Sequence, residues 1–134
     1  MSLIRNSKQT KQGIDFTGLQ NGKIHPTDID AVLEFDDEIL ICFEMKRRGN
    51  EMEDGQKLVY QRIVDAWIKC GKYGYVLKIE HDFKDDNLDV PIELCEVTEY
   101  YSEKGVWEKP YTGDVKTLLN DIGNRCYNDK LNFV

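Results

Sequence analysis

The sequence predicts an α/β protein in which a small mixed β-sheet of about four strands is flanked by helices. Two stretches of alternating apolar and polar residues, 29–35 and 39–46, predict a pair of β-strands. A helical repeat of apolar residues follows over 59–70, and a further strand pattern over 73–80 comes directly after it. A chain of 134 residues has the size of one domain, so we expect a single domain over residues 1–134.

The first two predicted strands form an amphipathic hairpin. Because side chains alternate between the two faces of a strand, each strand has one apolar and one polar face. A three-residue turn at 36–38 sets Leu33 opposite Ile41 on the apolar face and Asp30 opposite Glu44 on the polar face. A two-residue turn would pair apolar with polar side chains, so we expect the three-residue turn.

The polar face of this hairpin gathers charges that folding energetics alone would not select. In the same register Asp28 lies opposite Lys46, so three carboxylates and one ammonium share a patch. Like charges across a sheet are destabilising, and Asp is depleted in strands. The patch is either a solvated acidic surface or the site of a divalent cation.

The residue types favour the cation. Mg²⁺ prefers oxygen ligands and binds through one or two carboxylates together with waters and substrate phosphate. We predict that Asp30 and Glu44 bind Mg²⁺, for which Mn²⁺ would substitute, and that Asp28 assists. Lys46 would then orient a nucleophilic water or steady a phosphate oxygen, which are the roles needed for phosphodiester hydrolysis.

These residues carry a resemblance to a known family. The run D-I-D, a hydrophobic strand, a turn and E-M-K, at 28–46, looks like the metal-binding motif of the PD-(D/E)xK nuclease superfamily. Asp30 fits the essential Asp of that pattern better than Asp28, because apolar residues follow it. The resemblance covers residues 26–80 and implies a restriction-endonuclease-like core in which Asp30, Glu44 and Lys46 are catalytic.

The next predicted helix begins at an N-cap, Asp54, and ends at Gly71. Its expected buried stripe consists of the apolar residues at helical spacing, Val59, Ile63, Ala66, Trp67 and Cys70. Gln56 and Tyr60 stand four residues apart and therefore share a face.

The run Q-K-L-V-Y at 56–60 resembles the Q-x-x-x-Y element that several exonuclease-like and phage-type branches of the superfamily carry after (D/E)xK. The resemblance implies that Gln56, Lys57 and Tyr60 meet a nucleic-acid backbone. The alternative is that Tyr60 packs in the core and Gln56 is solvated. Phosphate contacts are also expected from the basic pair Arg47 and Arg48.

The remaining segments complete the expected fold. A short helix is expected near residues 3–12. The strand at 73–80 should pair in parallel with the hairpin, because a helix precedes it. Residues 91–101 and 105–109 predict a further strand and a short hairpin, and Asp114 should cap a last helix. Trp107 and Tyr111 are expected to pack, with base stacking as the alternative.

Composition bears on compartment and partner. The chain has no bilayer-length apolar run, and its four cysteines are widely spaced, so we expect a cytoplasmic protein with no membrane partner. The net charge of −7 argues against nucleic acid, since phosphate binding relies on Lys and Arg. However, residues 1–27 and 46–72 each carry +3 and residues 80–134 carry −7. The segments that flank the acidic hairpin are therefore basic.

We accordingly expect a Mg²⁺-dependent nuclease that acts on DNA, with RNA as an open alternative. Small relatives implied by the resemblance include Holliday junction resolvases, which act as homodimers on branched DNA. The competing interpretation is a catalytically inactive protein that keeps the nuclease fold and binds nucleic acid or a protein partner through its acidic surface.

Overall fold

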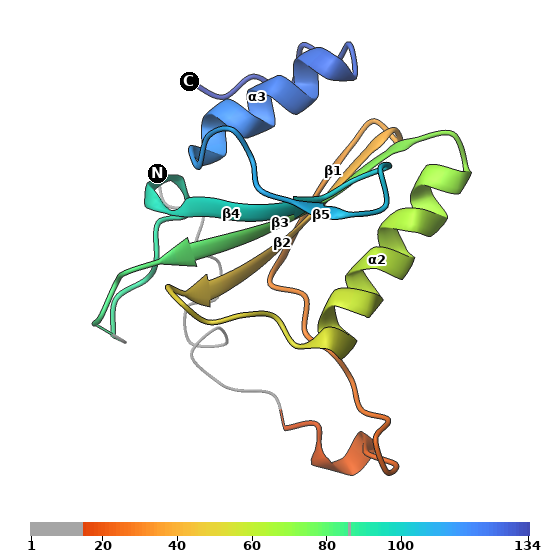
Figure 1. Ribbon diagram of the computed structural model, residues 1–134, viewed down its shortest axis with the longest axis vertical. Helices are drawn as coiled ribbons and strands as arrows, with labels where there is room; N and C mark the ends of the chain where they lie inside the picture. The colour runs from red at the N-terminus through yellow and green to blue at the C-terminus, as the bar shows by residue number, and fades with distance from the viewer. Residues whose placement is uncertain (1–14, 86) are drawn as a thin grey trace.

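The computed structural model describes residues 15–85 and 87–134, which contain one five-stranded mixed sheet (Figure 1). The strands are neighbours in chain order, and they are β1 (Ala31–Phe35), β2 (Ile39–Arg47), β3 (Tyr73–His81), β4 (Glu96–Tyr101) and β5 (Trp107–Glu108). The helical elements are η1 (Thr17–Leu19), α2 (Asp54–Lys69), η2 (Ile92–Leu94) and α3 (Val115–Arg125). The predicted α/β class is confirmed, with five strands where about four were expected.

The register of the β1–β2 hairpin confirms the three-residue turn, since Leu33 lies opposite Ile41. Asp36 and Asp37 adopt positive φ angles of 52° and 58°, a conformation that Asp tolerates better than most residues. Lys72 pairs with the Asp37 carboxylate at 2.7 Å. The acidic turn is therefore stabilised by a cation from the segment between α2 and β3.

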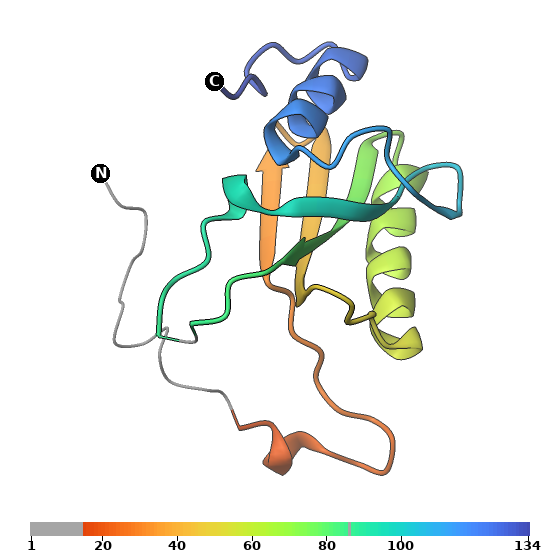
Figure 2. The same ribbon diagram turned by 60° about the vertical axis from the view of Figure 1, so that its left-hand side comes forward.

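The two long helices cover opposite faces of the sheet (Figure 2). On one face Ile41 and Leu77 are buried in a cluster with Leu119 of α3. On the other face Val76 packs with Val64 of α2. β2 and β3, which α2 connects, pair in parallel as predicted.

The buried face of α2 differs from the predicted stripe. It is centred on Tyr60 and Val64, each 0% exposed, whereas Ala66 and Cys70 are exposed. The prediction left Tyr60 out of the stripe and assigned it to nucleic-acid contact, with packing in the core as the alternative. In the structure the Tyr60 hydroxyl has a buried partner, so the ring can be buried without losing a hydrogen bond.

The ends of α2 lie close to their predicted positions. Glu53 rather than Asp54 is the N-cap, and the helix ends before Gly71, whose φ of +81° suits a helix terminus. α3 begins as predicted, because the Thr117 N–H donates to the Asp114 side chain at 2.9 Å.

The C-terminal part of the sheet follows the prediction except at its start, where residues 92–94 form η2 and the expected strand over 91–101 begins only at Glu96. A turn between β4 and β5 is closed by a hydrogen bond from the Gly105 N–H to the Ser102 carbonyl oxygen. Trp107 is half-buried and its ring centroid lies 5.5 Å from that of Tyr101, which supports packing rather than base stacking. Tyr111 is 78% exposed, so the expectation that it packs is wrong. The helix expected near residues 3–12 lies outside the described residues.

In the described part of the chain, no helix is both long enough and apolar enough to cross a membrane.

Candidate active site

Glu44 is the centre of the site. It lies near the end of β2 on the face that α2 covers, and it is 4% exposed. The Tyr60 hydroxyl donates to Glu44 Oε2 at 2.5 Å, and the Gln56 side-chain amide donates to Glu44 Oε1 at 2.9 Å. Because these residues are one helical turn apart, α2 brings one donor to each carboxylate oxygen.

The protonation chemistry of Glu44 follows from this environment. Burial raises the pKa of Glu44, and the nearby charge of Asp30 raises it further. Hydrogen bonds from Tyr60 and Gln56 and the charge of Lys46 oppose that rise in pKa. Burial and the contact with Glu44 also raise the pKa of Tyr60, so its hydroxyl stays a donor at neutral pH.

Asp30 is held beside Glu44 by the backbone of β2. The Met45 N–H donates to Asp30 Oδ2 at 2.7 Å. Since Met45 stands between Glu44 and Lys46, this bond places the Asp30 carboxylate next to the E-M-K segment. Asp30 directly precedes β1 and is exposed.

Lys46 lies on the same face as Glu44, two residues further along β2. Its Nζ is 3.5 Å from Glu44 Oε1, and its side chain is 26% exposed. The ammonium group is therefore close to the buried carboxylate and still accessible from outside.

The structure brings together two of the three carboxylates that were predicted to bind a metal ion, those of Asp30 and Glu44. Among the residues described, no group of three or more Asp, Glu, His or Cys side chains is arranged to hold a metal ion. Asp28 lines a neighbouring groove, because it lies before β1 and the strand pairing does not extend to it. Asp30 and Glu44 still suit Mg²⁺, which binds through one or two carboxylates and keeps several waters.

That groove has a volume of about 670 Å³ and separates the segment 16–28 from the first half of α2. We call it the 16–28 groove. Lys46 and Gln56, which both contact Glu44, line it together with Asp28 and His25. The His25 Nδ1 lies 2.9 Å from the Pro26 carbonyl oxygen, so this ring also participates in a local turn.

The residues predicted to contact nucleic acid differ from one another in burial and in their partners. Tyr60 is completely buried and holds Glu44, so its expected contact with a nucleic-acid backbone is corrected to a supporting role. Gln56 also holds Glu44, but it reaches the groove. Lys57 pairs with Glu99 at 3.6 Å and lies over the ring of Trp107, with its Nζ 5.2 Å from the ring centroid.

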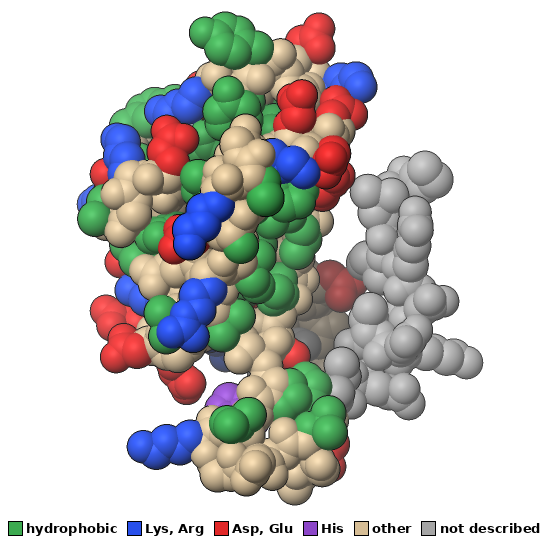
Figure 3. Space-filling view, turned by 90° about the vertical axis from the view of Figure 1, so that its right-hand side faces the viewer, with side chains coloured by type: hydrophobic (Ala, Val, Ile, Leu, Met, Phe, Trp, Pro, Cys, Tyr) green, Lys and Arg blue, Asp and Glu red, His purple; other side chains and the backbone are tan. Residues whose placement is uncertain are grey.

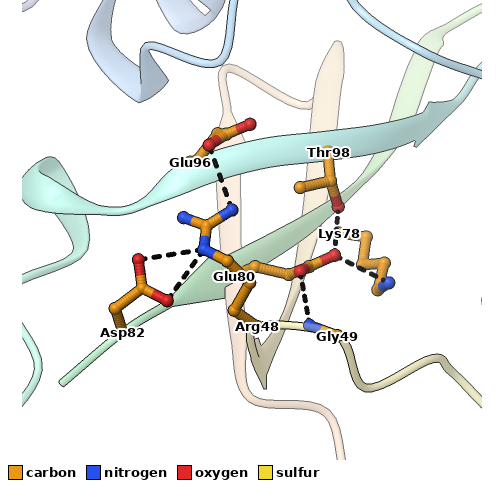
Figure 4. A network of polar contacts seen from close by, with 7 residues as sticks. All are labelled: Arg48, Gly49, Lys78, Glu80, Asp82, Glu96 and Thr98. Carbon is orange, nitrogen blue, oxygen red and sulfur yellow. Dashed lines mark hydrogen bonds and ion pairs between the residues drawn. The ribbon is translucent and has the colours of Figure 1, made fainter. Parts of the chain in front are cut away.

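Arg48 is engaged in ion pairs. Its Nε donates to both carboxylate oxygens of Asp82, at 2.8 and 2.9 Å, and its Nη1 donates to Glu96 at 3.2 Å (Figure 4). Arg47 is exposed at the end of β2 and lines a small hollow of about 160 Å³ next to Arg48. A phosphate contact by Arg48 would have to compete with two carboxylates.

Sequence reasoning missed a second polar cluster on the same face of the sheet. The Glu80 carboxylate accepts hydrogen bonds from Lys78 at 3.0 Å, Thr98 at 2.9 Å and the Gly49 N–H at 3.0 Å (Figure 4). Lys78 lies beside Glu44 in the β2–β3 pairing. The signal was present in the sequence, because Lys78 and Glu80 interrupt an otherwise apolar strand.

The cluster around Glu80 helps to hold the candidate active site in place. Glu80 binds the turn that follows Lys46 and leads into α2, the helix that carries Gln56 and Tyr60. Burial tends to raise the pKa of Glu80, but its hydrogen bonds with Gly49, Lys78 and Thr98 outweigh that effect, so the pKa is lowered. Glu80 therefore remains ionised and holds the turn at neutral pH.

Comparison of the chain with protein-family models, curated proteins and solved structures gives no match. The functional argument therefore depends on the geometry of these residues.

Proposed function

We propose that this protein is a Mg²⁺-dependent nuclease of the PD-(D/E)xK type that hydrolyses phosphodiester bonds in DNA. The observation that carries the proposal is the convergence of two separate sequence elements on one buried carboxylate. Asp30 and the E-M-K segment provide the charges, and α2 provides the two donors to Glu44.

Each residue has a distinct role in the proposed reaction. Asp30 and Glu44 would hold the cation, while Tyr60 and Gln56 are positioning residues that orient Glu44. Lys46 would donate a hydrogen bond to the attacking water or to a non-bridging phosphate oxygen. The attacking water loses a proton to solvent as its oxygen forms a bond to phosphorus, the bond to one ester oxygen breaks, and the departing oxygen takes a proton from solvent.

A bound divalent cation would act as a Lewis acid that lowers the pKa of water and offsets the charge that develops on phosphate. The residues fit such an ion, because a buried carboxylate and a neighbouring Asp leave negative charge only partly compensated by Lys46.

The direct test is cleavage of plasmid, linear and branched DNA in Mg²⁺ or Mn²⁺. Glu44→Gln and Lys46→Ala should each reduce the rate about a hundredfold or more, because each removes a group that acts on the reacting phosphate. Glu51→Gln and Lys69→Ala, which alter exposed residues outside the site, are the matched controls. Cleavage that persists in both site variants would come from a contaminant and would defeat the proposal.

Cation binding can be measured without DNA. Mn²⁺ at a hundredfold excess over its Kd should stabilise the wild-type protein by about 2.7 kcal/mol, seen as a rise in Tm. Asp30→Asn should abolish that rise. An unchanged response in Asp30→Asn would show that the ion binds elsewhere.

The finer assignments are also proposals. The resemblance to Holliday junction resolvases favours branched DNA and a homodimer, and a solution mass by light scattering tests the dimer. All four cysteines are free and Cys70 is exposed, which suits the reducing cytoplasm.

A second candidate is a non-catalytic protein that keeps this fold and binds a partner through its acidic surface. The pairing of only two carboxylates within the described residues and the net charge of −7 favour it. DNA or protein binding without any Mn²⁺-dependent change in Tm or cleavage would select this candidate.

A further inference from the structure

The 16–28 groove leads outward from the candidate active site. Lys46 and Gln56, which line it, both contact Glu44 Oε1. Figure 3 views the molecule from the side of α2 and shows the segment 15–28 as a lobe below the body, with a hollow between them. A ligand that lies in the groove would therefore meet two residues that contact the proposed catalytic carboxylate, although Glu44 itself does not line the groove.

The charge of the groove is opposite to that of the whole protein. Lys23, Lys46 and Arg62 line it against two carboxylates, Asp28 and Glu53, which gives +1 with His25 neutral, whereas the chain carries −7. Within residues 15–85 and 87–134, neither Lys23 nor Arg62 forms an ion pair with a carboxylate. These two cations are therefore available to bind phosphate groups.

The groove also has apolar walls. Phe16 and Ile24 line it from the N-terminal segment, and Val59 lines it from α2. Ile24 is 73% exposed and Phe16 is half-buried. Cations along a backbone path combined with an aromatic ring are the features by which proteins bind unpaired nucleic-acid strands, whose bases have free faces for stacking. A duplex presents phosphates, but its bases are already stacked.

The dimensions agree with a single strand. Its volume of about 670 Å³ falls within the range of about 300–1,000 Å³ that is usual for pockets that bind small ligands. A groove of this size is too small for a whole duplex. Gln56, Val59 and Arg62 are spaced three residues apart along one side of α2. The distance along the helix from Gln56 to Arg62 is about 9 Å, so this side of the groove is long enough for a short stretch of one strand.

From these observations we infer that the 16–28 groove binds one unpaired nucleic-acid strand and leads it to the site at Glu44. The inference rests on the proposed nuclease function for its biological meaning, and it narrows the substrate to DNA with an unpaired segment at the point of cleavage, such as a flap, an overhang or a branch. Lys23 and Arg62 contact the phosphates, and Phe16 stacks on a base.

Binding without cleavage tests the groove separately from the chemistry. A fluorescein-labelled single-stranded DNA oligonucleotide is titrated with the full-length protein in EDTA, and binding is followed by fluorescence anisotropy. The variants are Phe16→Ala and the double variant Lys23→Ala/Arg62→Ala. Lys69→Ala, at the far end of the same helix and outside the groove, is the control, and thermal unfolding checks that all variants are folded.

We expect Phe16→Ala to weaken single-strand binding about tenfold, the effect of losing one stacked base. The double variant should flatten the plot of log affinity against log salt concentration by about 1.4, because each phosphate contact on a single strand contributes about 0.7. Lys69→Ala should bind like the wild type, and a blunt duplex of equal length should bind more weakly than the single strand.

Unchanged affinity and salt dependence in the folded groove variants would overturn the inference, as would a blunt duplex that binds as tightly as the single strand. If cleavage occurs but the groove variants bind normally, the groove assignment fails while the nuclease proposal stands. If the single strand binds through the groove but no cleavage occurs with Mg²⁺ or Mn²⁺, the nuclease proposal fails while the groove assignment stands.

Discussion

Tyr60 and Gln56 show how a buried carboxylate is oriented by the side chains around it. Each donates to a different oxygen of Glu44, which leaves the carboxylate one fixed orientation. In the proposed nuclease Glu44 is a metal ligand, and groups that orient metal ligands are worth about 10–100-fold in metal affinity or activity.

Removing the Tyr60 hydroxyl should therefore slow cleavage without unfolding the protein. Tyr60→Phe keeps the buried ring, and we expect a loss of rate of about 10–100-fold together with weaker Mn²⁺ binding. Tyr101→Phe is the control, because the Tyr101 hydroxyl also bonds a carboxylate, Asp65, at 2.8 Å but away from Glu44. Equal rates for Tyr60→Phe and the wild type would mean that Glu44 needs no orienting partner.

Glu80 should make the free energy of unfolding depend on pH. Its folded-state pKa is lowered from the ordinary value near 4.5, so its ionised form stabilises the fold above that pH. The stabilisation is lost as the pH falls through the lowered folded-state pKa. Glu80→Gln should reduce the free energy of unfolding by about 2 kcal/mol at pH 7, because the buried partner Lys78 loses its counter-charge.

The difference between wild type and Glu80→Gln should shrink as the pH is lowered from 7 to 3, measured by urea unfolding at each pH. Glu51→Gln removes an equal charge from an exposed residue and should change stability by less than about 0.5 kcal/mol. A difference that stays constant over this pH range would show that Glu80 does not stabilise the fold through its charge.

At the scale of elements, the position of α2 on the sheet determines whether Tyr60 reaches Glu44. Gly74 of β3 allows the close approach of this helix, because a Cβ atom there would lie 2.9 Å from Val64 Cγ1 and 3.3 Å from Ile68 Cγ1. Contacts this short would force side chains or the helix to shift. The site and the packing of α2 are therefore linked through one glycine.

Gly74→Ala should destabilise the protein by about 1–3 kcal/mol through overpacking. Gly55→Ala is the matched control, since Gly55 lies in the first turn of α2 and an added Cβ would meet nothing within 4 Å. We expect that control to be neutral or stabilising by up to about 1 kcal/mol. Urea unfolding measures both, and equal stability of the two variants would contradict the close approach.

For the whole molecule, the C-terminal segment closes the face of the sheet that α3 covers. Leu131 is 2% exposed and belongs to the core cluster of that face. The Asn120 side chain of α3 binds both the N–H and the carbonyl oxygen of Phe133, at 2.6 and 2.8 Å. The chain after α3 is thus part of the core layer.

Leu131→Ala should cost about 2–5 kcal/mol, the usual range for truncating a buried Leu. Asn132→Ala, at the adjacent exposed position, should change the free energy of unfolding by less than about 0.5 kcal/mol. Thermal and urea unfolding test both variants. A cost below 1 kcal/mol for Leu131→Ala would show that the segment packs only loosely on α3.

Much of the fold could be predicted from the sequence, because the signals are local. Alternating apolar residues and the acidic turn determine the β1–β2 register, which brings Asp30 next to Glu44 and Lys46. Asp114 marks the start of α3 in the same way. Such patterns depend on neighbours in the chain, so a sequence contains them in full.

The environment of Glu44 depends on contacts between distant segments. Alternation assigns Glu44 to a face of β2, but only the docking of α2 on that face buries the carboxylate and turns Tyr60 inward instead of toward a ligand. The cluster around Glu80 and the 16–28 groove likewise combine segments far apart in the chain. Sequence periodicity specifies which residues share a face, whereas burial depends on which element covers that face, and this is determined by the packing of the whole molecule.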